Sequence, residues 1–87
     1  MTTIDQRLRE LGITVPEPFA PLGRYVPAVR VGDLVFLSGT GPVRPDGSVV
    51  TGKVGRDLDL DTARAAARLT GLQLLAVLTA ELGSLDR

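Results

Sequence analysis

The chain has 87 residues, 44% of them hydrophobic, and its ten basic residues balance its ten acidic ones. This length allows one small domain at most, and the absence of cysteine and histidine excludes disulfides, thiol nucleophiles, Ser-His-Asp triads and the usual zinc sites. With no net charge and no basic run, nucleic acid is not an expected partner. The longest uninterrupted apolar run, Leu74 to Leu78, is too short to cross a bilayer and the N-terminus lacks a signal pattern, so we expect a cytoplasmic protein with no membrane partner.

Residues 1–24 are predicted to form a short helix followed by a proline-rich arm. Apolar residues recur at helical spacing over residues 3–11, behind Thr3 and Gln6, which match the pattern of a capping box. Gly12 suits the end of this helix. Four of the six prolines follow soon after and favour an extended arm, because each one removes a backbone donor and restricts the residue before it.

Residues 25–87 are predicted to form three strands and then a helix. A hairpin comes first, because the segments 26–31 and 34–38 flank Gly32-Asp33, a pair that suits a type II′ turn. The second strand does not alternate with polar residues, so both of its faces should be covered, as in a central strand. One helix covers only one face, which predicts that another subunit covers the other.

A third strand is predicted over residues 48–53, after the turn signal Pro45-Asp46-Gly47. The segment from Gly47 to Lys53 also has the glycine and lysine spacing of a phosphate-binding loop. However, Val54 stands where the magnesium-binding Ser or Thr belongs, and no helix follows directly. We therefore interpret the segment as a strand and expect no metal site there.

One long helix is predicted from about Leu60 to Leu82, with Gly83 at its end. Asp57, Asp59 and Asp61 cluster at its start. Capping and the helix dipole account for these carboxylates better than a metal does.

The two faces of this helix differ. The side chains of the predicted core face are small near the start of the helix and larger toward its end. This face consists of Ala63, Ala66, Ala67, Thr70, Leu74, Val77 and Leu78. The opposite face begins with Arg64 and Arg68, which are expected to form solvated pairs with Asp61. It becomes apolar later, at Leu72, Leu75 and Leu82, which predicts that these leucines contact something other than the chain's own sheet.

A small-residue segment, Ser38-Gly39-Thr40-Gly41-Pro42, closes the buried strand and leaves backbone amides open to an anion or a carbonyl oxygen. A simple bend at the strand end explains the same residues. Tyr25, the only tyrosine, could pack at the sheet edge or touch a ligand.

The run from Tyr25 to Gly39, read as YVPAVRVGDLVFLSG, resembles the Rid family of YjgF-type reactive intermediate deaminases, also known as the L-PSP endoribonuclease type. The likeness continues through Gly41-Pro42, Asp46-Gly47 and Gly52-Lys53-Val54-Gly55. The arm sequence from Arg7 to Ile13 is similar to that of one YjgF-like subgroup.

The resemblance implies an α+β, chorismate-mutase-like fold with helices on one face of a mixed sheet, of which this chain holds the N-terminal part. It also implies a homotrimer with ligand pockets between subunits and no cofactor. Active members hydrolyse 2-imino acids to 2-keto acids and ammonia, with water as the attacking group. In this sequence Tyr25, Ser38 and Gly39 match the family's substrate-binding positions.

Two features separate the chain from active family members. Thr40 stands where a Gln is common, and the family's carboxylate-binding Arg and water-positioning Glu belong to a half that would follow residue 87. We therefore assign no catalytic residue and expect no deaminase activity from these residues alone. The alternatives are a non-catalytic trimer that binds a small carboxylate or metabolite, and a fragment without independent function.

Overall fold

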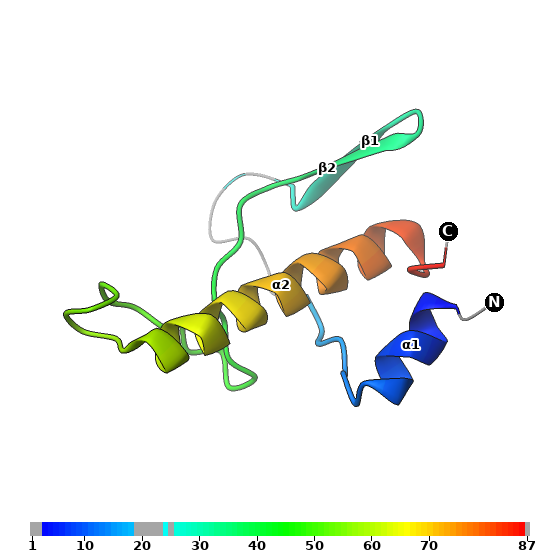
Figure 1. Cartoon of the computed structure of the whole chain (residues 1–87). Coiled ribbons are helices and arrows are strands. Elements are labelled where there is room, and N and C mark those ends of the chain that lie inside the picture. The colour runs from blue at the N-terminus through cyan, green and yellow to red at the C-terminus, as the bar shows by residue number, and fades with distance from the viewer. Residues whose placement is uncertain (1–2, 19–23, 25, 87) are drawn as a thin grey trace.

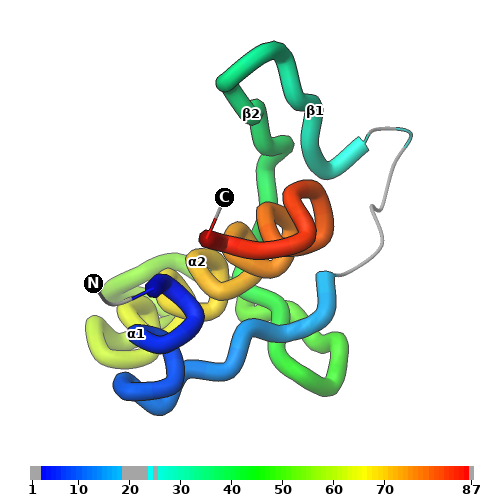
Figure 2. Tube along the Cα trace, turned by 90° about the vertical axis from the view of Figure 1, so that its right-hand side faces the viewer, coloured from blue at the N-terminus to red at the C-terminus, as the bar shows by residue number. Residues whose placement is uncertain are grey.

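The computed structural model describes residues 3–18, 24 and 26–86. In chain order it contains the helix α1 (Ile4–Glu10), the strands β1 (Ala28–Val31) and β2 (Leu34–Leu37), and the helix α2 (Leu60–Leu82) (Figure 1). The hairpin of β1 and β2 lies on one side of α2, whereas α1 and the segment after it lie on the other (Figure 2). The expected α+β class is confirmed, with α2 in contact with both strands of a two-stranded antiparallel sheet.

The helix α1 has the predicted capping box. The Thr3 hydroxyl accepts a hydrogen bond from the Gln6 backbone N–H at 3.1 Å, and the Gln6 amide oxygen accepts one from the Thr3 N–H at 2.9 Å. Gly12, with φ of 70°, follows the end of the helix in the left-handed region, as predicted. The N–H of Ile4 donates to the Asp86 carboxylate at 2.7 Å, so the first turn of α1 is tied to the segment that follows α2.

The hairpin forms in the predicted register, with Val31 opposite Leu34 across the turn. Gly32 has φ of 59° and no residue other than glycine has a positive φ among those described, which agrees with a type II′ turn. The two faces of the hairpin differ in exposure. One face carries the half-buried Ala28, Val35 and Leu37, on the side of α2. The other, called here the outer face, consists of Val29, Val31, Leu34 and Phe36, which are all exposed.

The prediction of a third strand over residues 48–53 is wrong for the described chain. Only one bridge forms there, between Val43 and Val49, across the predicted turn. The Arg44 N–H donates to the Ser48 carbonyl at 2.8 Å, but Pro42 and Pro45 have no N–H to extend the ladder. The segment is therefore a short turn held to itself, and it adds no strand to the sheet.

The helix α2 begins and ends where the sequence predicts. The Asp59 carboxylate accepts from the Thr62 N–H at 2.7 Å, and Gly83 has φ of 80° and donates to the Thr79 carbonyl. The expected pairs of Arg64 and Arg68 with Asp61 do not form among the described residues.

The predicted core face of α2 is not its most buried face. Gln73 and Ala76 are the most enclosed residues, with exposed fractions of 3% and 1%, and neither belongs to the predicted face. At roughly 100° per residue they lie between the two faces that the sequence suggested. The reason is that the hairpin packs on one flank of α2 and the arm on the other, so the strip between them is covered from both sides. Leu72, Leu75 and Leu82 are half-buried, and Leu72 lies beside Thr14 and Pro16 of the arm, as expected of a contact outside the sheet.

By length and composition alone, α2 is one helix that could cross a membrane, with a mean hydropathy of 1.3 in its most apolar window. A soluble core helix meets the same criterion. In this chain α2 contacts both strands of the hairpin, and 11% of that window is buried.

Candidate functional site

Ser38 lies at the open end of the hairpin, directly after β2. Its backbone N–H donates to the Pro27 carbonyl at 2.9 Å, and its hydroxyl donates to the Val26 carbonyl at 2.6 Å. These two bonds fix Ser38 against the residues that precede β1. Tyr25, which comes immediately before this pair in the sequence, lies outside the described residues.

Gly39 continues from Ser38 as exposed backbone. A Cβ placed at Gly39 would meet no atom within 4 Å, and its φ is not in the left-handed region. Neither a turn nor close packing within the described chain therefore requires a glycine here. The backbone stays open to a ligand or to another chain.

The bonding of Ser38 limits what its hydroxyl can do. Its proton is already donated to Val26, so the oxygen can offer only its lone pairs to a ligand. Among the described residues no ionisable side chain is hydrogen-bonded to Ser38, so no neighbouring base could activate it as a nucleophile. The hydroxyl is suited to accept a hydrogen bond from a bound N–H group.

A cleft of about 320 Å³ adjoins this end of the hairpin, between the start of β1 and the last turns of α2. It is lined by Val26 and Pro27, whose carbonyls accept the two hydrogen bonds from Ser38, and by Val77 and Ala80 of α2. Among the described residues that line the cleft, Glu81 is the one with a carboxylate. Sequence analysis missed Glu81, because an acidic residue near the end of a helix carries no local sign that a cleft lies beside it.

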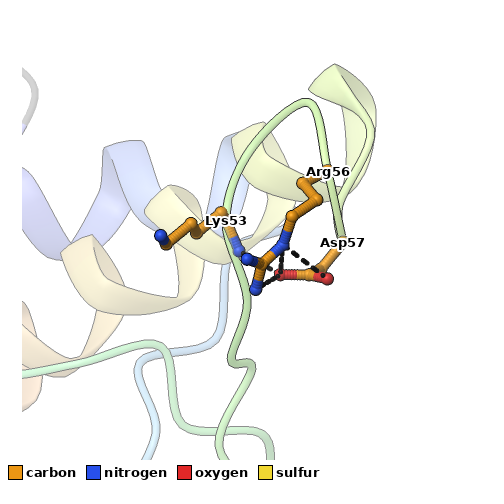
Figure 3. A network of polar contacts seen from close by, with 3 residues as sticks. All are labelled: Lys53, Arg56 and Asp57. Carbon is orange, nitrogen blue, oxygen red and sulfur yellow. Dashed lines mark hydrogen bonds and ion pairs between the residues drawn. The ribbon is translucent and has the colours of Figure 1, made fainter.

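The aspartates near the start of α2 have structural partners. The Asp57 carboxylate accepts from the Lys53 N–H at 2.9 Å and from the Arg56 guanidinium at 2.9 Å, which closes a tight turn (Figure 3). The hydrogen bond from Arg56 is the main cause that lowers the pKa of Asp57, and hydrogen bonds from Thr62 lower the pKa of Asp59. The capping prediction is confirmed for Asp59, whereas Asp57 clamps the preceding turn instead. Within the described part of the chain, no three acidic side chains are grouped so that they could hold a metal ion.

The turn from Lys53 to Asp57 also settles the geometry of the segment that resembles a phosphate-binding loop. Gly52 has φ of 130°, and the Lys53 N–H is bonded to Asp57 rather than open to an anion. No helix N-terminus follows Lys53 directly, because α2 begins only at Leu60. The segment is a turn, and not the strand that the sequence suggested.

Comparison with known proteins places this fold. No family model matches the chain. A curated relative, Protein TCP17 from Trypanosoma cruzi, is 39% identical over 80 residues, which are 92% of this chain and 50% of the relative. Two solved structures are also similar. A "putative endoribonuclease" from Shewanella oneidensis MR-1 aligns with a TM-score of 0.90 and 34% identity, over 99% of this chain and 57% of that one.

The second solved structure is the protein Atu1372 of unknown function from Agrobacterium tumefaciens. It aligns with a TM-score of 0.77 and 41% identity, over 97% of this chain and 50% of that one. The chain thus spans about half the length of the relatives it matches. The agreement in both sequence and backbone confirms the resemblance drawn from the Tyr25 to Gly39 run, and the chain has the fold of part of a YjgF-like domain.

Proposed function

We propose that the whole domain to which this chain belongs hydrolyses 2-imino acids to 2-keto acids and ammonia. In this reaction water adds to the imine carbon, the carbon–nitrogen bond breaks, and the nitrogen leaves as ammonia with the protons it has gained. The observation that carries the proposal is the position of Ser38, fixed by two hydrogen bonds at the open end of the hairpin and followed by unobstructed backbone at Gly39.

In the proposed site Ser38 positions the substrate and does not attack it. Its hydroxyl oxygen accepts a hydrogen bond from the N–H of the protonated imine, since its own proton is given to Val26. The open backbone at Gly39 lets the planar imino acid approach the strand end without a side chain in the way. Tyr25 would contribute a further contact to the same substrate, as the family resemblance implies.

Beyond Glu81 in the adjoining cleft, the described residues do not supply the rest of such a site at Ser38. A bound imino acid needs a cation for its carboxylate and an acid group to orient the water, and neither is bonded around Ser38 in the described chain. We propose that other parts of the whole domain, or another subunit, provide them. The outer face of the hairpin supports the second source, because four exposed apolar side chains on one face favour association. A homotrimer is the proposed assembly.

The test follows keto acid release while 2-aminoacrylate is generated in situ. It compares the 87-residue chain with the protein isolated from its native source, whose intact mass establishes the chain that is assayed. We expect hydrolysis above background from the native protein, a loss of about tenfold or more on Ser38→Ala, and background rates from the 87 residues alone. Thr51→Ala, at an exposed site away from the hairpin, is the control for the Ser38 substitution and should leave the rate unchanged. A native protein that assembles but shows only background hydrolysis would refute the proposal.

The second candidate is a non-catalytic trimer that binds a small carboxylate. It is favoured by the lack of any ionisable partner for Ser38 among the described residues. Binding of a keto acid to the native protein, together with background hydrolysis, would identify this function. RNA cleavage, which the name of the Shewanella protein suggests for that protein, receives no support from a chain with zero net charge.

A further inference from the structure

The turn closed by the bridge between Val43 and Val49 contains a chemically reactive pair, Asp46-Gly47. In an aspartyl-glycyl pair the glycine nitrogen can attack the side-chain carboxyl carbon of the aspartate, because glycine has no Cβ to hinder the approach. Asp46 is the only aspartate in the sequence that precedes a glycine, and the six others precede larger residues. The chain has no asparagine, which would undergo the related reaction. Rearrangement of this kind is therefore expected at Asp46 before any other residue.

The rearrangement has two steps and needs only water. First, the backbone nitrogen of Gly47 bonds to the side-chain carbon of Asp46 and loses its proton, and the carboxyl hydroxyl leaves as water, which closes a succinimide ring. Water then opens the ring at either carbonyl. One opening restores aspartate, and the other gives isoaspartate, in which the main chain runs through the side-chain methylene. Both residues are exposed, so water has access to the ring.

Ser48 holds the Asp46 carboxyl group in its unreactive form. The Oδ1 atom of Asp46 accepts from the Ser48 N–H at 2.9 Å and from the Ser48 hydroxyl at 2.6 Å. That hydroxyl accepts from the Arg44 guanidinium at 3.1 Å, which leaves its own proton for Asp46. The hydrogen bond from the hydroxyl is the main cause that lowers the pKa of Asp46. Less of the neutral carboxyl, which is the form that can release water, is therefore present at neutral pH.

The Gly47 nitrogen is engaged as well. Its N–H donates to the Arg44 carbonyl at 2.9 Å, and its φ of 90° is one that glycine adopts readily. Ring closure requires the loss of this proton, and hence of this hydrogen bond. It also consumes the carboxylate that Ser48 holds. The folded turn thus opposes the reaction at both reacting groups.

We propose that Asp46-Gly47 is a latent isomerisation site, which is protected while the turn is folded and reacts when the turn opens. The backbone hydrogen bonds from Arg44 to the Ser48 carbonyl and from Gly47 to the Arg44 carbonyl both close loops that contain the Asp46-Gly47 link. Isoaspartate adds one carbon to each loop, so the modified turn cannot form again unchanged. The site shares no residue with the Ser38 end of the hairpin and is independent of the proposed hydrolysis.

Labelled water detects the reaction, because each ring opening in H₂¹⁸O leaves an ¹⁸O atom in the aspartate or isoaspartate that forms. The purified chain is incubated in H₂¹⁸O near neutral pH, either folded or unfolded in guanidinium chloride, and is then digested in ordinary water. Trypsin releases the peptide 31–53, because the bond between Arg44 and Pro45 resists cleavage. This peptide also contains Asp33, which precedes a leucine and serves as an internal reference. Fragment masses assign the label to one aspartate or the other.

We expect Asp46 to acquire ¹⁸O about tenfold faster in the unfolded chain than in the folded one, and Asp33 to stay nearly unlabelled in both. In the folded chain, Ser48→Ala should label Asp46 about threefold faster or more, because the hydroxyl's hydrogen bond to the carboxylate is lost. Thr51→Ala, at an exposed site beyond the turn, is the control and should leave the rate unchanged.

Three outcomes would overturn the proposal. They are equal labelling of Asp46 in the folded and unfolded chains, no labelling of Asp46 in either, and labelling of folded Ser48→Ala at the rate of Thr51→Ala. The comparison of folded with unfolded protein uses the unmodified chain, so it remains decisive if Ser48→Ala fails to fold. The readout is a label in the polypeptide and not substrate turnover, so its failure would leave the proposed hydrolysis untouched.

Discussion

Val29→Asp tests whether the outer face of the hairpin is covered by another subunit. Val29 is central to this face, opposite Phe36, and its exposed fraction in the single chain is 48%. Full burial of a valine contributes about 1.5 to 3 kcal/mol, so covering the exposed half contributes about 1 kcal/mol per subunit. An unpaired carboxylate in the same interface adds several kcal/mol of desolvation cost. We expect a total of about 3 kcal/mol or more per subunit, which weakens association by over a hundredfold.

Val49→Asp is the matched control. Val49 is also a valine in an antiparallel bridge, with an exposed fraction of 45%, but it lies in the turn after β2 and not on the outer face. Light scattering at micromolar concentration should show an oligomer for the unmodified protein and for Val49→Asp, and a monomer with intact α2 helicity for Val29→Asp. A monodisperse monomer before any substitution, or an oligomer that survives Val29→Asp, would refute the reasoning.

Three further predictions concern α2 and its ends. Gly83→Ala should destabilise the fold by about 1 kcal/mol in urea unfolding, because Gly83 has φ of 80°. Gly71→Ala lies in the helix interior with open space around its Cβ, and it should stabilise the fold by up to about 1 kcal/mol. A change of the same sign in both variants would contradict this account. Ala76→Leu should cost about 1–3 kcal/mol by overpacking the most enclosed site, and Ala80→Leu, on an exposed part of the cleft, should cost little. Hydrogen bonds from Thr62 lower the pKa of folded Asp59, so the stabilisation by its carboxylate is complete above the ordinary pKa near 3.8 and is lost as the pH falls through the lower folded pKa. The urea concentration at the unfolding midpoint should therefore decrease when the pH is lowered below about 4, and it should decrease less steeply in Asp59→Asn. The same pH dependence in both proteins would contradict the capping role.

Local signals in the sequence predicted the elements of this fold well. The capping box of α1, the Gly32-Asp33 turn and both ends of α2 depend on residues within about four positions of one another, and each forms as expected. The third strand failed because a strand needs a partner along its whole length, and two prolines near the turn deny it one.

Features that depend on distant segments were not predictable in the same way. The buried strip of α2 at Gln73 and Ala76 follows from two flanking contacts, and no pattern within the helix reports them. At the candidate site, the small residues after β2 indicated Ser38 and Gly39. The bonds of Ser38 to Val26 and Pro27, and the cleft carboxylate of Glu81, required the folded hairpin beside α2. The substrate contact expected of Tyr25 stays a prediction.

The hydrogen bond between Ile4 and Asp86 has a consequence for the order of events during synthesis on the ribosome. It joins residues 82 positions apart, so α1 receives this contact only after Asp86 has left the exit tunnel. A seven-residue helix is marginal by itself in water. The helix α1 is therefore secured only after α2 has been made, and its docking closes residues 4–86 into a ring.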